Sequence, residues 1–329
     1  MTARWLLLLS ALLAVACSEQ TATEDYAGPR YTLDAERISV SGISAGAYMA
    51  GQMHVAMSAT VRGAGLIAGG PYGCAQNSLS IALEQCTKEG NPDVDKLQAA
   101  LKQSAEADLI DDLAHLDGSP VWLFRSPTDD LVGQTLLDAT AEQYRALGAR
   151  VTVVDDFEAA HGVPTIGTGA ACASFESPYL NACNFDAAGA ILGTIYGSLE
   201  PRGEVTGELL TVSVPGADAA DLLPDAFLYV PAECAAGESC GLHVFFHGCS
   251  QSSELVGDAV ARGAGFNEWA ESNRLLVLYP QARRSKVAPI NPLGCFDWWG
   301  YTDDRYRTRE GKQIQVIAAL LAALAGPSP

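Results

Sequence analysis

Apolar and polar residues alternate along the chain in short runs that predict strands and helices in turn. Residues 36–44 alternate Ile38 and Val40 with polar side chains, the two-residue period of a strand, and 45–58 follow at once with helix-forming alanine and methionine. Further strands are predicted at 63–70, 121–125, 151–154, 209–214, 227–230, 242–246 and 275–279, and further helices within 77–116 and at 140–148, 265–273 and 313–324. This alternation predicts an α/β fold with a mostly parallel sheet and helices on both faces.

The composition narrows the class of protein. Hydrophobic residues make up 48% of the 329 residues, which suits a packed core, and no repeat or low-complexity linker divides residues 31–326. We therefore expect a single domain there, and a monomer. The net charge of −19 argues against nucleic acid or an anionic membrane surface as a partner and favours an uncharged substrate.

The N-terminus has the pattern of an export signal. Arg4 precedes a short apolar run, and residues 1–16 are too short a hydrophobic segment to span a bilayer. Ala-Val-Ala-Cys, ending at Cys17, is typical of a bacterial lipoprotein cleavage site, with an ordinary signal peptide as the alternative. Residues 17–30 are expected to form a tether. The mature protein would be secreted, or held at the outer surface or in the periplasm by a lipid on Cys17.

Eight cysteines remain after Cys17, and an even number in an exported chain predicts disulfides. Sequence proximity pairs Cys74 with Cys86, Cys172 with Cys183 and Cys234 with Cys240, which leaves Cys249 with Cys295. There is no C-x-x-C pair and the histidines are scattered, so no metal site is expected.

The first predicted strand runs into Gly42-Ile43-Ser44-Ala45-Gly46, a G-x-S-x-G motif. Between a strand and a helix this motif forms a sharp turn that exposes the serine as a nucleophile. Ser44 therefore has both the motif and the context of a catalytic serine.

A catalytic serine needs a general base and a carboxylate that orients it. His161 lies in a loop after the predicted strand at 151–154, and the chain order serine, acid, histidine makes it the expected base. Asp129 and Asp130, just after the strand at 121–125, are the first candidates for the acid, and Asp155 and Asp156 are the alternatives.

Acyl transfer by a serine also needs hydrogen-bond donors for the developing oxyanion. One is expected to be the N–H of Ala45, the residue after the serine. The loop that supplies the second donor is absent before Ser44, but strand 242–246 leads into His247-Gly248-Cys249, which has the form of such a loop. We therefore predict a circularly permuted order of parts, with the Cys249 N–H as second donor.

Several strings of this sequence resemble one known family. They are SVSGISAGAYMAGQM (39–53), AGGPYGCA (68–75), SPYLNACNFDAAGAILGTIYG (177–197), LHVFFHGCSQS (242–252) and GCFDWWGY (294–301). Together they resemble the single-domain, circularly permuted poly(3-hydroxybutyrate) depolymerases. The resemblance implies an α/β-hydrolase fold, secretion, a triad of Ser44, Asp129 and His161, and oxyanion donors at Ala45 and Cys249. Ala45 stands where the family is expected to have serine, which a backbone donor tolerates.

The same resemblance implies a crevice whose aromatic and aliphatic side chains hold one polyester chain. The candidates for substrate contact are Tyr72, Trp298, Trp299 and Tyr301, with Phe296 in the same cluster; any of them could instead belong to the core. No cofactor is implied. A feruloyl or acetylxylan esterase is the alternative function, and a polymer-binding protein without catalysis is a second alternative.

Overall fold

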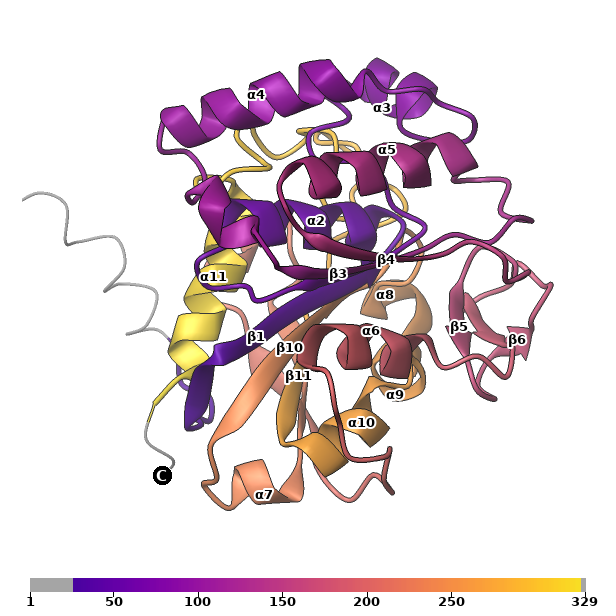
Figure 1. Cartoon of the computed structure of the whole chain (residues 1–329). Helices are drawn as coiled ribbons and strands as arrows, with labels where there is room; N and C mark the ends of the chain where they lie inside the picture. The colour runs from indigo at the N-terminus through magenta and orange to yellow at the C-terminus, as the bar shows by residue number, and fades with distance from the viewer. Residues whose placement is uncertain (1–25, 327–329) are drawn as a thin grey trace, which may run out of the picture.

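The computed structural model of the chain describes residues 26–326 (Figure 1). The predicted signal segment and Cys17 lie outside these residues. Tyr26, which falls in the predicted tether, is buried in the core, so the packed domain includes residues before 31. Within residues 26–326, no helix combines the length and the apolar character that crossing a bilayer requires.

An eight-stranded sheet forms the centre of the molecule. Its strands are β1 (Leu33–Ile43), β2 (Ala64–Ile67), β3 (Pro120–Phe124), β4 (Arg150–Val154), β8 (Glu208–Ser213), β9 (Asp225–Val230), β10 (Cys240–Phe246) and β11 (Leu275–Tyr279). They lie in the order β4-β3-β2-β1-β10-β11-β9-β8. Every neighbouring pair is parallel except those that β9 makes with β11 and β8. The predicted mostly parallel sheet is confirmed.

Helices cover both faces of this sheet (Figure 1). On one face are α2 (Ala45–Ala56), α4 (Val94–Glu106), α5 (Gln134–Ala146) and α11 (Lys312–Leu324), and on the other are α6 (Ala187–Tyr196) and α10 (Phe266–Asn273). Each face has its own cluster of buried apolar side chains. The core is therefore two layers separated by the sheet, as the nearly continuous apolar strands predict.

Shorter elements complete the described chain. They are α3 (Leu79–Gln85), η1 (Leu113–Leu116), η2 (Ala217–Ala220), α7 (Ala232–Ala235), α8 (Ser253–Val256), α9 (Ala259–Gly263) and a small sheet of β5 (Val163–Thr165), β7 (Leu180–Ala182) and β6 (Ala170–Ala171). The hydrophobic pattern missed α6, because its alanines and glycines give no clear polar face. It also missed the small sheet, whose strands are too short for a period to be visible.

The predicted helix at 140–148 is corrected to α5, which begins at Gln134. Leu136 and Leu137 on its first turns are buried, so the apolar stripe of this helix starts earlier than the sequence prediction placed it. The other predicted strands and helices agree with the structure to within a few residues at their ends, which is the usual uncertainty of element boundaries.

All four predicted disulfides are confirmed: Cys74–Cys86, Cys172–Cys183, Cys234–Cys240 and Cys249–Cys295. Such bonds persist in oxidising compartments, which fits a secreted protein.

The first strand of the chain lies in the middle of the sheet, with β10 from the C-terminal half beside it. The ends of the described chain also meet, since the Tyr31 N–H donates to Leu324 O (2.8 Å) and the Gly326 N–H donates to Tyr31 O (3.0 Å). Adjacent ends are what a circular permutation requires. The permutation itself stays a prediction.

Candidate active site

Ser44 lies at the sharp turn between β1 and α2, with a positive φ of 56° that a serine seldom adopts. Two glycines make this turn feasible. A Cβ on Gly46 would lie 2.1 Å from Phe246 O, and one on Gly42 would lie 2.3 Å from Gly46 O. Any side chain at these positions would push α2 away from β10. The G-x-S-x-G pattern is therefore a packing requirement between α2 and the strands β1 and β10, and it holds Ser44 in a strained conformation.

Two backbone segments lie next to Ser44. Ala45 begins α2, so its N–H is one of those that a helix leaves without an intrahelical acceptor. Gly248, in the loop after β10, lies so close that a Cβ added there would be 3.4 Å from Ser44 Cβ. The structure thus brings together the serine, Ala45 and the His-Gly-Cys loop, although the loop is some two hundred residues away in sequence.

His247 fixes the orientation of this loop. The Ala282 N–H donates to His247 Nε2 (3.1 Å), so the ring proton is on Nδ1, which donates to Gly248 O (2.8 Å). The ring is buried, and burial lowers its pKa to about 4, so it stays neutral. The C=O and N–H of a trans peptide point in opposite directions. Pinning Gly248 O toward His247 therefore directs the Cys249 N–H to the other side, and the Cys249–Cys295 disulfide anchors the same residue.

Asp129 and His161 form the hydrogen-bonded pair of the site. His161 Nδ1 lies 2.7 Å from Asp129 Oδ2, and Asp129 Oδ1 accepts from the N–H groups of Leu131 (2.8 Å) and Val132 (3.0 Å). Burial by itself would raise the pKa of Asp129. The hydrogen bond and charge of His161, with the two backbone N–H groups, outweigh burial, and the pKa of the carboxyl is lowered. Asp129 is therefore ionised at neutral pH and holds the imidazole in one orientation.

The other three carboxylates considered for this role take different positions. Asp130 is exposed beside Asp129, and Asp155 accepts a hydrogen bond from Gln134 Nε2 at 3.2 Å. Asp156 is exposed. Of the four, Asp129 is the one in contact with His161.

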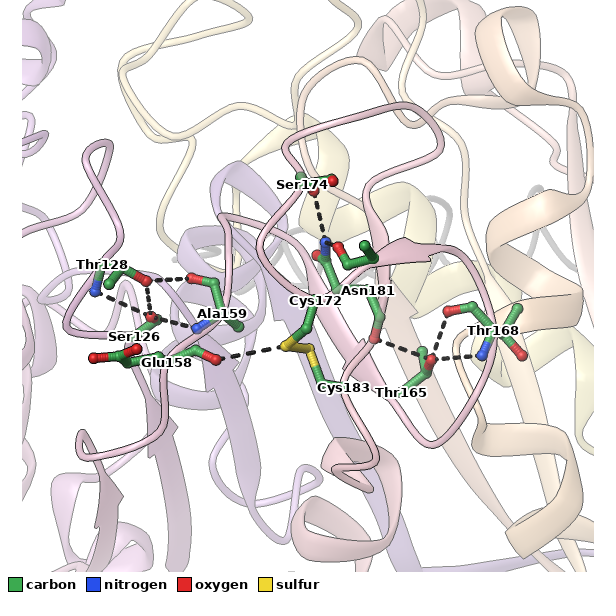
Figure 2. The surroundings of a disulfide bond; sticks show 11 residues. Ser126, Thr128, Glu158, Ala159, Thr165, Thr168, Cys172, Ser174, Asn181 and Cys183 are labelled. Carbon is green, nitrogen blue, oxygen red and sulfur yellow. Dashed lines mark hydrogen bonds between the residues drawn. A yellow bond between two sulfur atoms is a disulfide. The ribbon is translucent and has the colours of Figure 1, made fainter.

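Hydrogen bonds join the loop that contains Asp129 to the loop that contains His161 (Figure 2). Ser126 Oγ accepts from the Ala159 N–H (2.8 Å), and Thr128 Oγ1 donates to Ala159 O (3.0 Å). The Ala160 N–H donates to Cys172 O (2.8 Å), and Cys172 is bonded to Cys183. The disulfide and these hydrogen bonds hold the two loops in register, which sets the distance between Asp129 and His161.

Gln251 connects the His161 side of the site to the loop beside Ser44. Its Oε1 accepts from the Gly248 N–H (2.7 Å), while its Nε2 lies 3.3 Å from Tyr179 O. Tyr179 packs on Phe175 with ring centroids 4.9 Å apart, and Phe175 lies edge-on to His161 at 6.1 Å. Gln251 is buried. No sequence signal distinguished it from an ordinary polar residue, because the carbonyls that Nε2 reaches, Pro178 O and Tyr179 O, lie about seventy residues away.

One buried carboxylate folds the aromatic loop that the sequence singled out. Asp297 Oδ1 accepts from the N–H groups of Trp299 (3.2 Å), Gly300 (2.7 Å) and Tyr301 (3.0 Å), and Oδ2 accepts from both the N–H and the hydroxyl of Thr302. Burial is the largest influence on Asp297 and raises the pKa of its carboxyl. The side chain thereby closes the loop on itself, while the backbone N–H and C=O of Asp297 bond to Gln313 and Gln52 elsewhere in the domain.

The aromatic candidates do not all lie in one place. Trp298 stacks on Tyr48 at 4.9 Å and belongs to the buried cluster that contains Ala45, with Trp299 partly buried against it. Tyr301 is partly exposed, but its hydroxyl donates to Cys295 O (2.9 Å). Phe296 is fully buried.

Tyr72 is separate from that cluster. It is buried in the core on the α2 face, and its hydroxyl donates to Arg307 O (2.8 Å). We therefore leave Tyr72 out of the proposed substrate contacts.

A hydrogen-bonded network of one histidine and two serines lies inside the sheet. His243 Nδ1 is 2.7 Å from Ser39 Oγ, and its Nε2 is 2.6 Å from Ser41 Oγ. All three side chains have no exposed surface, and burial lowers the pKa of His243 to about 3. This network satisfies buried polar groups between β1 and β10, and a substrate has no access to it.

The fold and the turn at Ser44 define an α/β-hydrolase. No protein-family model matches the chain. The chain is 36% identical over 306 residues to a poly(3-hydroxybutyrate) depolymerase of Delftia acidovorans, covering 89% of this chain and 60% of that protein. It thus spans less than two thirds of the Delftia protein. It is 35% identical over 324 residues to a polyhydroxybutyrate depolymerase of Talaromyces funiculosus, covering 93% of this chain and 94% of that one.

Solved structures agree with these sequence relatives. The crystal structure of PHB depolymerase from Penicillium funiculosum, and that of a PHB depolymerase variant complexed with an R3HB trimer, each give a TM-score of 0.83. Both are 32% identical to this chain, covering 90% of it and 96% of the solved chain. The chain therefore belongs to the poly(3-hydroxybutyrate) depolymerase family, whose members are carboxylic ester hydrolases.

Proposed function

We propose that this protein is an exported serine esterase that hydrolyses poly(3-hydroxybutyrate), or a related aliphatic polyester and its oligomers. The observation that carries the proposal is the partly buried Asp129–His161 hydrogen bond of 2.7 Å. The same domain holds a strained Ser44 at a G-x-S-x-G turn. The relatives named poly(3-hydroxybutyrate) depolymerase, and the solved complex of one with an R3HB trimer, support the substrate class.

In the proposed reaction, His161 accepts the proton of Ser44 as Ser44 Oγ attacks an ester carbonyl. Asp129 accepts the hydrogen bond from His161 Nδ1 and stabilises the imidazolium that forms. The N–H groups of Ala45 and Cys249 donate to the oxyanion. The alcohol end leaves with the proton from His161, and a water molecule then releases the acyl group by the same steps.

Exposed apolar side chains next to the site support an aliphatic polymer as substrate. Phe175 is 55% exposed and touches His161, and Leu131 is 38% exposed with its N–H bonded to Asp129. Leu293 is 51% exposed, and its carbonyl accepts from the Ser250 N–H beside Cys249. Large exposed apolar groups near a site are typical of surfaces that bind apolar partners. Trp299 and Tyr301 are proposed as further contacts, with Trp298 behind them.

The proposal also covers the cellular location and the oligomeric state of the enzyme. The four disulfides support an extracytoplasmic location, and the Ala-Val-Ala-Cys sequence supports a lipid anchor on Cys17. The enzyme would act as a monomer on polymer fragments outside the cytoplasm. Mass analysis of membrane and soluble fractions after expression tests the anchor: a diacylglyceryl-modified Cys17 supports it, and an unmodified soluble chain contradicts it.

The test of the function compares three substrates under one condition. Protein with all four disulfides is given amorphous poly(3-hydroxybutyrate), soluble 3-hydroxybutyrate oligomers and a feruloyl ester, with Ser44→Ala as the inactive control. Release of 3-hydroxybutyrate or its dimers from either polyester substrate supports the proposal. Turnover of the feruloyl ester alone would contradict the proposal and support the alternative function, a feruloyl or acetylxylan esterase. No turnover of any substrate by correctly folded protein would favour a binding protein.

A further inference from the structure

A cavity of about 350 Å³ opens at the end of the sheet opposite Ser44. Its lining includes Arg37 near the start of β1 and Asn273 and Arg274 just before β11. Ser44 follows the other end of β1, seven residues and therefore roughly 23 Å away along the strand. The cavity is thus distinct from the proposed catalytic site, and nothing in the ester hydrolysis proposed above uses it.

Three guanidinium groups line this cavity: those of Arg37, Arg62 and Arg274. We call it the arginine cavity. The Arg37 side chain is held in place, because its Nη2 donates to Asn273 O (2.9 Å) and its guanidinium carbon lies 5.4 Å from the centre of the Tyr196 ring. Tyr196 is itself fixed by hydrogen bonds to Arg37 O (3.1 Å) and Ser39 Oγ (2.7 Å). The cavity therefore has a preorganised wall.

The donors of these arginines exceed the acceptors that the protein supplies. Among residues 26–326, neither Arg37 nor Arg62 has a carboxylate within salt-bridge distance, and Arg274 reaches Glu233 and Glu238 only at 3.8 Å. Arg62 has one long hydrogen bond, to a backbone carbonyl at 3.5 Å. Three guanidinium groups carry about fifteen N–H donors in planar forks that match an oxoanion. The three residues that carry these donors line the cavity.

Nearby groups of the protein already offset part of the positive charge of the three arginines. Helices α6 and α10 both end at the cavity, and the C-terminal end of a helix attracts a cation. Glu200 also lines the cavity. The end of α10 accounts for Arg37, and Glu233 and Glu238 offset part of the charge of Arg274. Arg62 remains without a carboxylate partner, in a chain whose net charge is −19. Like charges held together are stabilised by a bound anion.

We propose that the arginine cavity is a binding site for a small oxoanion, either a carboxylate or a phosphate group. Two sources fit this chemistry. One is the carboxylate that ester hydrolysis releases, and this source rests on the proposed function. The other is inorganic phosphate or a phosphoryl group, which is independent of it. Binding of either would place a ligand on the far end of the strand that carries Ser44.

The test measures anion binding by calorimetry and by the shift in unfolding temperature. The protein is Ser44→Ala with its disulfides intact, so the result does not depend on esterase activity. Sodium 3-hydroxybutyrate and sodium phosphate are titrated at constant ionic strength, with chloride as the control anion. Either anion binding in preference to chloride supports the proposal, and the tighter one identifies the source. A protein that binds neither anion would overturn it.

Two variants distinguish a specific anion-binding site from nonspecific electrostatic attraction of anions to the protein. Arg62→Gln removes one of the three guanidinium groups that line the cavity. Arg145→Gln removes the same charge from an exposed position on α5. We expect Arg62→Gln to weaken anion binding roughly tenfold, the loss of one charge-assisted contact, and Arg145→Gln to leave it unchanged. Equal weakening by both substitutions would show attraction by net charge alone and would contradict the proposal.

Discussion

Asp129 and Asp130 are adjacent and chemically identical, yet the structure gives them different surroundings. Asp129 turns inward, accepts two backbone N–H groups and contacts His161, while Asp130 faces solvent. The two residues therefore form a matched pair in which one change should affect the reaction and the other should not.

We predict that Asp129→Asn lowers kcat by about 10³–10⁴-fold with little change in KM. An amide cannot stabilise the imidazolium, and its N–H₂ group can orient the ring with the wrong nitrogen protonated. Initial rates on a soluble 3-hydroxybutyrate oligomer measure the effect, and Asp130→Asn is the control. Similar rates in the two variants would remove Asp129 from the proposed triad.

His247 offers a second prediction at the residue scale, because its Nδ1 proton pins the Gly248 carbonyl. We predict that His247→Ala lowers kcat by about 10²-fold, the usual cost of losing one oxyanion donor, and leaves KM nearly unchanged. His247→Asn, whose side-chain amide can donate from nearly the same place, should recover part of the rate. An equal loss in both variants would indicate a purely structural role for the ring.

At the scale of elements, the sequence was informative where the determining contacts are local. The turn at Ser44 was predictable because strand, glycines and helix are consecutive, and three disulfides were predictable because their cysteines are near neighbours. The choice of Asp129 over Asp130 rested on family resemblance, since the way a loop side chain turns depends on tertiary contacts. Gln251 could not be predicted, because the carbonyls to which its Nε2 donates are brought to it only by folding.

The segment between β4 and α6 yields a prediction about its disulfide. Replacing Cys172 and Cys183 with serine should cost about 3 kcal/mol of stability by the loop-closure estimate, and should also lower kcat because the His161 loop loses its anchor. Urea unfolding and oligomer hydrolysis measure the two effects.

The matched control replaces Cys234 and Cys240, a pair at the start of β10 and far from its His-Gly-Cys end. This variant should lose comparable stability and keep its kcat. If the two double variants have the same kcat, the Cys172–Cys183 disulfide does not position His161.

At the scale of the whole molecule, the sheet and its two apolar layers join segments from both halves of the chain. β1 is first in sequence but central in the sheet, and the ends of the described chain are hydrogen-bonded to each other. This arrangement explains how Ser44, near the N-terminus, can lie beside the His-Gly-Cys loop of the C-terminal half. It also places three histidines in the interior, where burial affects their titration.

We predict that the protein loses stability as the pH falls below about 6.5. Burial lowers the pKa of His54 and His243 to about 3 and that of His247 to about 4, against an ordinary value of 6.5. Between those values the unfolded chain binds protons that the folded chain does not, so acid favours unfolding. In that range, each histidine lowers the free energy of unfolding by up to about 1.4 kcal/mol for every unit by which the pH falls.

Thermal unfolding at pH 8, 7, 6 and 5 tests this prediction. The unfolding temperature should change little between pH 8 and 7 and fall from pH 6 to 5. The lowered pKa of Asp129 adds stability that is present above the ordinary carboxyl pKa and lost only in stronger acid. An unfolding temperature that is the same at pH 5 and pH 7 would contradict the neutral, buried state of the three histidines.

The most direct test of the central claim is covalent labelling of the nucleophile with a fluorophosphonate, followed by mass analysis of the peptides. The probe is applied to the wild-type protein, to Ser44→Ala and to Ser39→Ala, which removes one of the two serines bonded to the buried His243. We predict one adduct, on Ser44, in the wild type and in Ser39→Ala, and none in Ser44→Ala. An adduct that persists in Ser44→Ala, or no adduct on folded wild-type protein, would contradict the assignment of Ser44 as the nucleophile.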